Sequence, residues 1–434
     1  MALGGGLFTT QNKVLPGAYI NFVSMATASS VLSERGIATM PLELDWGVDG
    51  EVFTVTSEDF SKNCLKLFGY QNTHEKMKGL RELFKNIHTL HAYKIGSGVK
   101  AANTFAEAKY TGVRGNDLKI VIKDSPEGGG LYDVETMLDT VIVDTQSVRI
   151  ATALTANDYV TFKADATLSA TAATPLTGGT NGTVSGGDYQ TYLDKIESYT
   201  YNAMGVETTD DSVKSLCAAF CKRLRDEMGI KFQCVIHNHA ADHMGVVNVK
   251  NAVIDDKWSS AALVYWVTGA IAGCAVNKSV QNRVYDGEFN LNVDYTQVQL
   301  AAAIKAGEFT VHRVNSALRV LEDVNSMVTT TENCGEVFKE NQTVRVIDQL
   351  ANDDAVLFAT KYLGTVPNDA SGRTSLWSDL VKIRQELQDI RAIENFNDAD
   401  VTVEAGESKK SVVAGSSITI LQTMSKLYMT NVIS

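Results

Sequence analysis

The sequence has no concentrated positive charge. Its 434 residues include 39 Lys and Arg against 51 Asp and Glu, which gives a formal net charge of −12, and the basic residues form no tail or cluster. Phosphate binding needs Lys and Arg gathered on one surface. The composition therefore argues against nucleic acid as the main partner.

Long hydrophobic runs are also missing. The longest is Ala261–Val276, 16 residues that include Thr268 and two glycines, whereas a membrane-spanning helix needs about 20 apolar residues. We interpret the run as a buried helix and expect no membrane insertion. The segment Met1–Lys13 has no charged stretch followed by an apolar one, so we expect no secretory signal.

The sequence contains no CxxC pair, and its six cysteines lie mostly in apolar, core-like stretches. They are Cys64, Cys217, Cys221, Cys234, Cys274 and Cys334. This distribution is typical of reduced thiols in a protein that folds in the cytosol.

Motifs of common enzymes are absent as well. The Gly-rich segment Thr177–Gly182 lacks the Lys of a phosphate-binding loop, and neither G-x-S-x-G nor HExxH occurs. We therefore expect no enzymatic activity and no cofactor.

One segment leaves an alternative open. His237, His239 and His243 lie within seven residues and could bind zinc, with Cys234 or Asp242 as the fourth ligand. His237 and His239 share a face only if a strand continues through residue 239, so we favour a structural role. A metal-dependent hydrolase centred on these three histidines remains the alternative function.

The chain is too long for one simple core, so two or three domains are expected. Strand and helix patterns alternate before residue 96 and again after Asp188, which predicts an α/β core domain with a mixed, largely parallel sheet and flanking helices. Between them, residues 97–180 are rich in Thr, Ala, Gly and Asp, with short alternating strands separated by turns. They are expected to form an inserted, mostly β domain.

Two long helices are predicted near the end of the chain, over Asn341–Leu363 and Arg373–Phe396. In the second, apolar residues recur with a 4-3-4-3 spacing that predicts one buried seam. They are Leu376, Leu380, Ile383, Leu387 and Ile390. The basic residues Arg384 and Arg391 are seven apart, beside this seam, and are expected to share a surface stripe.

The most informative segment is 263–287, LVYWVTGAIAGCAVNKSVQNRVYDG. An apolar helix with Gly269 and Gly273 four residues apart, which allows close packing, runs into the polar turn Asn277–Ser279. The segment resembles a signature of contractile phage tail sheath proteins and of the sheaths of phage-tail-like bacteriocins. Further similar segments follow in the family's order, and together they cover essentially the full length: Leu15–Ile20 (LPGAYI), Leu42–Gly47 (LELDWG), Ala106–Asn116 (AEAKYTGVRGN), Leu176–Gly182 (LTGGTNG) and Val344–Asp348 (VRVID). In size the chain is most similar to sheaths of Gram-positive phages and diffocin-like particles.

The resemblance implies a structural subunit that polymerises as stacked hexameric rings around an inner tail tube. In the family, the sheath contracts by collective subunit rearrangement and drives the tube through the target cell envelope. Implied partners are further copies of this chain, the inner tube protein, and baseplate and tail terminator proteins. The implied location is the tail sheath of a virion or phage-tail-like particle assembled in the bacterial host cytoplasm. An adhesin or shell protein is a third reading, suggested by the Thr- and Gly-rich insertion.

The resemblance also assigns parts to residue ranges. It implies an N-terminal arm with an exchanged strand (1–24), two parts of the α/β core (25–96 and 181–398), an outer β-rich insertion (97–180) and a C-terminal β segment with an arm (399–434). The helix 373–396 is expected to face the tube through Lys382, Arg384 and Arg391. Strand exchange between subunits is expected to involve Ala18, Tyr19, Ile20, Phe22, Leu427, Tyr428, Met429 and Val432.

Overall fold

The computed structural model describes residues 32–96 and 98–433. The chain divides into two compact units. The large unit contains Arg35–Ala351 and the chain from Ile420 onward, and the small unit contains Asn352–Thr419.

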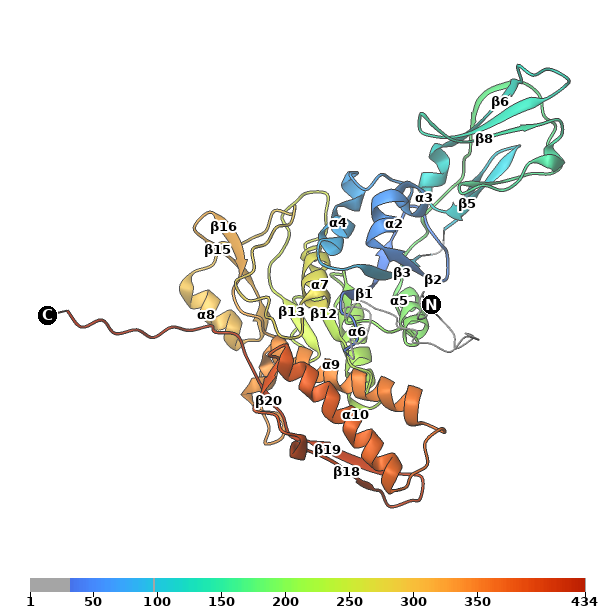
Figure 1. The fold of residues 1–434 in the computed structure, drawn as a ribbon. Helices are drawn as coiled ribbons and strands as arrows, with labels where there is room; N and C mark the ends of the chain where they lie inside the picture. Colours follow the sequence, from blue (N-terminus) through green and yellow to red (C-terminus); the bar gives the residue numbers. More distant parts are fainter. Residues whose placement is uncertain (1–31, 97, 434) are drawn as a thin grey trace, which may run out of the picture. The chain divides into compact units, whose positions relative to one another are not determined.

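The centre of the large unit is a seven-stranded sheet in the order β14-β13-β12-β11-β1-β3-β2 (Figure 1). Its strands are β1 (Ile37–Glu43), β2 (Val52–Thr56), β3 (Thr89–Ile95), β11 (Ala203–Val206), β12 (Gln233–His237), β13 (Val246–Val249) and β14 (Glu308–Phe309). Every neighbouring pair is parallel except β2 with β3. This confirms the predicted mixed, largely parallel α/β sheet.

Helices cover both faces of this sheet, and the side chains of each strand alternate between two hydrophobic cores. Val235 packs with α7 (Leu263–Gly273) and α4 (Lys78–Phe84), whereas Cys234 and Ile236 pack with α5 (Gly186–Ile196) and α6 (Asp211–Asp226). Strands buried on both faces read as continuous apolar runs in the sequence. The remaining helices of this unit are α2 (Ser57–Lys62), α3 (Cys64–Phe68) and α8 (Gln297–Lys305).

Helix α7 is the apolar helix of the sequence signature, and its glycines allow close contact with α4 and with the turn that follows α4. A Cβ added at Gly273 would lie 1.7 Å from the carbonyl oxygen of Asn86, and one added at Gly269 would lie 2.7 Å from that of Leu83. The prediction of close packing at these two glycines is confirmed. Nowhere in residues 32–96 or 98–433 is a helix both long and apolar enough to cross a membrane.

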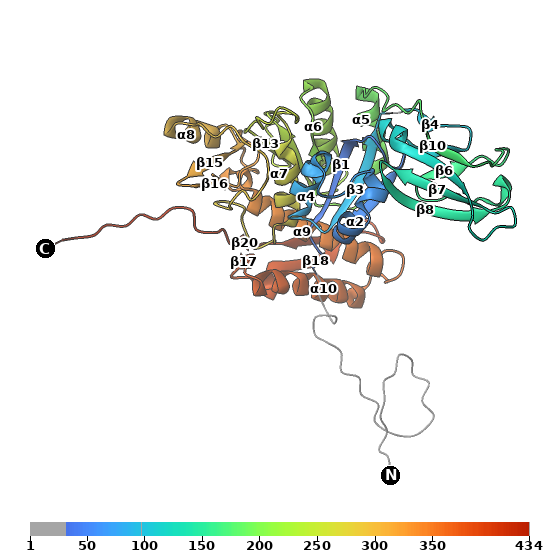
Figure 2. The same ribbon diagram turned by 90° about the horizontal axis from the view of Figure 1, so that it is seen from above.

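Residues 100–175 form two small antiparallel sheets instead of α/β structure (Figure 2). One has the order β10-β6-β7-β8, and the other has the order β4-β5-β9. The strands are β4 (Lys100–Ala102), β5 (Ala106–Thr111), β6 (Leu118–Asp124), β7 (Tyr132–Leu138), β8 (Val141–Val148), β9 (Val160–Phe162) and β10 (Thr171–Pro175). Leu118, Ile120, Ile122 and Val134 are buried in a core shared with Trp46.

After β15 (Val311–Val314) and β16 (Ala317–Val320), the chain enters helix α9 (Asn341–Leu357), which continues as one π-helical turn, Phe358–Tyr362. The predicted helix Asn341–Leu363 is therefore found, with its last turn widened. The boundary between the two units falls within α9.

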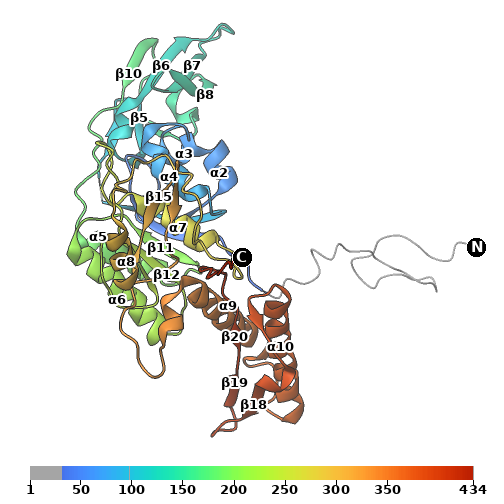
Figure 3. The ribbon, with the colours of Figure 1, turned by 90° about the vertical axis from the view of Figure 1, so that its left-hand side faces the viewer.

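The small unit contains helix α10 (Ala370–Asp389) beside the antiparallel hairpin of β18 (Val401–Ala405) and β19 (Val412–Ser416) (Figure 3). Two further short strands are β17 (Ile393–Glu394) and β20 (Thr419–Ile420). The indole N–H of Trp377 on α10 donates to the carbonyl of Val401, 3.0 Å away. The predicted seam is largely confirmed, because Leu376, Leu380, Ile383 and Leu387 are buried.

The bounds predicted for this helix, Arg373–Phe396, were wrong at both ends. Asp369 caps the start, since its carboxylate accepts from the amide of Gly372 at 2.7 Å. The helix stops after Asp389 in a Schellman motif, in which Ala392 N–H donates to Leu387 O and Arg391 N–H donates to Gln388 O, both at 2.8 Å. Arg391 is the left-handed residue of this motif, with φ 61°.

Candidate assembly surfaces

The last residues of the chain present unusual apolar exposure. From Gln422 to residue 433 the chain has no secondary structure and, in Figure 1, runs as an extended segment. Its large apolar side chains are between 70% and 102% exposed, and they are Met424, Leu427, Tyr428, Met429, Val432 and Ile433. In the single chain the residues expected to exchange strands here, Leu427, Tyr428, Met429 and Val432, do not form a strand. Large contiguous apolar exposure is typical of a surface that binds another protein.

The N-terminal residues expected to exchange strands, Ala18, Tyr19, Ile20 and Phe22, lie outside the described residues.

Helix α10 separates the three basic residues expected at the tube. Lys382 is exposed on the helix, and Arg391 is exposed beyond its end. Arg384 is buried, and its guanidinium holds the carboxylate of Asp354 through two bonds of 2.6 and 2.7 Å. The expected stripe shared by Arg384 and Arg391 does not exist, because the chain leaves the helix before Arg391. Arg384 therefore fixes α10 to the end of α9 within the small unit.

A groove in the small unit runs beside the β18–β19 hairpin. It consists of two adjoining cavities of about 590 and 340 Å³, which share the side chains of Phe358, Leu376 and Val412. Among the residues described, β19 forms a ladder only with β18. An open strand edge next to an apolar groove can accept an added strand from another chain.

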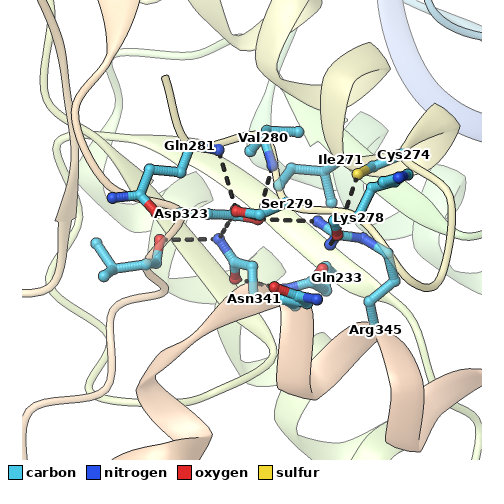
Figure 4. Close-up of polar contacts among 12 residues, drawn as sticks. Gln233, Ile271, Cys274, Lys278, Ser279, Val280, Gln281, Asp323, Asn341 and Arg345 are labelled. Atoms are coloured by element: carbon cyan, nitrogen blue, oxygen red, sulfur yellow. Dashed lines mark hydrogen bonds and ion pairs between the residues drawn. The ribbon is translucent and has the colours of Figure 1, made fainter. Parts of the chain in front are cut away.

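The turn that follows α7 belongs to a buried polar network (Figure 4). Asp323, 1% exposed, accepts from Ser279 Oγ and from the amide of Val280, both at 3.1 Å, and from Asn341 Nδ2 at 3.0 Å. The buried guanidinium of Arg345 lies 3.3 Å from Asp323 and donates to the carbonyl of Lys278 at 2.8 Å. The network ties the turn after α7 to the first residues of α9. Asp323 and Asn341 had no motif that would have marked them in the sequence.

A second buried ion pair holds the next turn of α9. Arg225 on α6 binds the carboxylate of Asp348 with two bonds of 2.6 and 2.7 Å. Removing one partner of such a pair leaves an uncompensated buried charge. The segment Val344–Asp348 that resembles the family thus contributes both of its charged residues to the core.

The three histidines of the alternative reading are engaged separately. His237 ends β12, where burial lowers its pKa, and the backbone amide of His239 donates to Asn248 Oδ1 at 2.8 Å. The ring Nδ1 of His243 accepts from Gly245 N–H, so its Nε2 carries the proton and donates to Asp226 at 3.1 Å. Over residues 32–96 and 98–433, no group of three or more His, Cys, Asp or Glu side chains has the arrangement of a metal site.

A crevice of about 400 Å³ lies at the carboxyl ends of β1, β3 and β11, the edge where ligands bind in many α/β proteins. Glu207 and Tyr265 both line it. Burial raises the pKa of Glu207 to about 7, although a hydrogen bond from Tyr265 opposes the shift. This carboxyl group makes the stability of the large unit sensitive to pH.

Sequence comparison matches four family descriptions to consecutive parts of the chain. They are the tail sheath protein Gp18 domain III N-terminal region (35–95), the phage tail sheath protein beta-sandwich domain (96–181), the phage tail sheath protein central domain (182–326) and the phage tail sheath C-terminal domain (334–434). The chain is also 30% identical to the phage-like element PBSX protein XkdK of Bacillus subtilis, over 98% of this chain and 99% of that protein. The chain belongs to the phage tail sheath protein family.

Solved structures agree with this assignment. The sheath tail protein of Desulfitobacterium hafniense is 34% identical with a TM-score of 0.82, over 95% of this chain and 99% of that one. The sheath tail protein of Listeria innocua is 30% identical with a TM-score of 0.80, over 90% and 93%. A contracted sheath of an extracellular contractile injection system shares the fold at 10% identity and a TM-score of 0.57, over 97% and 98%. This tail sheath protein is thus a structural subunit of a phage or phage-like tail.

Proposed function

We propose that this sheath protein assembles as stacked hexameric rings around an inner tail tube and contracts by collective rearrangement of its subunits. Sheath proteins of contractile systems have the same fold, and one such neighbour comes from a baseplate structure. The inner tube, baseplate and tail terminator proteins are therefore the proposed partners, and further copies of this chain form the rings.

The observation that carries the proposal is the exposed apolar C-terminal arm, residues 424–433. Burying one large apolar side chain stabilises a protein by about 1.5–3 kcal/mol relative to leaving it in water. The six exposed side chains of the arm would therefore gain free energy if a neighbouring subunit covered them. The arm of one subunit is proposed to lie along the open edge of β19 in a neighbour, with its apolar side chains in the groove lined by Phe358, Leu376 and Val412. The N-terminal residues Ala18, Tyr19, Ile20 and Phe22 are proposed to supply the second exchanged strand.

The contact with the tube is proposed to use Lys382 and Arg391. Both are exposed, whereas the side chain of Arg384 is occupied by Asp354. Arg384 therefore positions the helix that carries Lys382.

Deletion of residues 424–434 tests the role of the arm. The truncated protein is expected to keep the melting temperature of the full chain, because the side chains removed from the arm are exposed, but to form no hollow cylinders by negative-stain electron microscopy. Deletion of residues 1–17 is expected to have the same effect on cylinders. Normal cylinders from either truncation would contradict strand exchange, and a full-length protein that never forms cylinders would contradict the proposed function.

A further inference from the structure

The root of the C-terminal arm is held mainly by the side chain of Gln342. Gln342, 4% exposed in the first turn of α9, donates from Nε2 to the carbonyl of Leu421 at 3.1 Å and accepts from the amide of Thr423 at Oε1, also at 3.1 Å. These are the two bonds that the main chain of a parallel partner strand would make on either side of Gln422. We call this arrangement the amide clamp.

Neighbouring contacts reinforce the clamp. The hydroxyl of Thr423 also donates to Gln342 Oε1 at 3.2 Å, and Gln422 Nε2 donates to the hydroxyl of Thr343 at 3.1 Å. Among the described residues, Thr423 is the last with a hydrogen bond to the large unit. The clamp therefore marks the last hydrogen-bonded point of the arm.

The residues that flank Gln342 in α9 belong to the buried polar network. Asn341, the residue before Gln342, is fully buried, and its side chain donates to Asp323 and accepts from Gln233 Nε2 at 2.7 Å (Figure 4). Arg345, on the next turn, is held by Asp323 and Lys278. Because Asn341 and Arg345 hold the first turn of α9 at both ends, the backbone position of Gln342 is also held.

We propose that Gln342 is the positioning residue of the C-terminal arm: it fixes where the arm leaves the large unit and the direction in which it starts. The inference rests on the proposed strand exchange between subunits. Beyond the clamp, residues 424–433 can span about 33 Å when extended. Opening the clamp would release three more residues and lengthen the flexible segment by about 10 Å. The effective concentration of the arm at the β18–β19 hairpin of the neighbouring subunit would then fall.

The substitution Gln342→Met tests the inference, because Met has a similar volume and makes neither bond. Hydrogen-exchange mass spectrometry on the full-length protein before assembly should show the Thr423 amide exchanging about fivefold faster or more, as expected for loss of one hydrogen bond. Cylinder formation, followed by sedimentation and electron microscopy, should fall about tenfold or more. Gln342→Glu keeps the acceptor for Thr423 and loses the donor to Leu421, so it should lie between the wild type and Gln342→Met in both measurements.

Asn251→Met is the control. Asn251 is fully buried in the large unit and donates to the carbonyls of Asn292 and Val311, both at 2.8 Å, and not to α9. The variant should therefore lower the melting temperature without exposing the Thr423 amide or reducing cylinder yield. Wild-type cylinder yield from Gln342→Met, together with fast Thr423 exchange, would overturn the positioning role. Unchanged Thr423 exchange in Gln342→Met would overturn the clamp itself. Absence of cylinders from the wild type would instead overturn the proposed function on which the inference rests.

Discussion

At the scale of single residues, Glu207 links the stability of the large unit to pH. Its folded-state pKa is about 7, above the ordinary value of 4.5, so between these values the folded state keeps a proton that the unfolded state has lost. Stability therefore falls as pH rises from about 4.5 through 7.

The substitution Glu207→Gln should remove this dependence. The variant is expected to melt at a higher temperature than the wild type at pH 8, where the wild type has a charged carboxylate in the crevice, and at nearly the same temperature at pH 5. Thermal unfolding followed by circular dichroism at the two pH values measures the difference. An equal shift at both pH values would show that the effect does not come from ionisation of Glu207.

Gly273 is a position at which α7 approaches the neighbouring backbone closely. A Cβ at this position would lie 1.7 Å from Asn86 O in the turn after α4, so Gly273→Ala must push α7 away from this turn and should cost about 3 kcal/mol. Gly186→Ala is the control, because nothing lies within 4 Å of its added Cβ and Ala favours the first turn of α5. Chemical denaturation of both variants gives the two free energies, and similar losses would argue against close packing at Gly273.

At the scale of elements, the basic residues of α10 and its C-terminus differ in role: Arg384 is buried in an ion pair, whereas Lys382 and Arg391 are exposed. Arg384→Met leaves the carboxylate of Asp354, whose side chain is 28% exposed, without its partner and should destabilise the small unit by about 1–3 kcal/mol. Lys382→Glu changes an exposed side chain and should leave unfolding almost unchanged while preventing assembly on tubes. Cylinders of normal yield on tubes from Lys382→Glu would contradict the proposed tube contact.

Arg391→Gly completes this comparison. Glycine adopts the left-handed conformation at less cost than arginine, so the variant should be at least as stable as the wild type. Any loss of assembly on tubes then follows from the missing charge. The thermal midpoint and a tube co-sedimentation assay measure the two effects separately.

The sequence predicted the elements whose signal is periodic. The apolar seam of α10 and the close-packing glycines of α7 could be found because burial imposes a spacing on one element at a time. The end of α10 could not be predicted from the sequence. Arg391 takes the left-handed position that is usually filled by glycine, and the apolar pattern continues to Ile390 and Phe396. The pairing of Arg384 with Asp354 joins two helices across 30 residues, and no local pattern encodes such a contact.

At the scale of the whole molecule, the same limit applies to the assembly surfaces. The sequence predicts a donated strand at the end of the chain, and this stays a prediction, since the structure shows only that six large apolar residues there are exposed. Their anchor at Gln342 could not be predicted, because the clamp joins residues about 80 positions apart. The family segments Asn277–Ser279 and Val344–Asp348 were recognised separately, and the structure shows that they meet at or beside the same buried network.

The amide clamp has a mechanical consequence under the contraction proposed for the sheath. Tension applied through an arm enters the fold at Leu421–Thr423, where neutral hydrogen bonds to the side chains of Gln342 and Thr343 bear the load before it reaches β20. Each such bond has a net free energy of about 1 kcal/mol, far less than the ion pairs that hold α9 below it. Under strain, the hydrogen bonds of the clamp would therefore break before the α/β domain unfolds. The link between neighbouring subunits would lengthen, and the subunits would stay folded and connected.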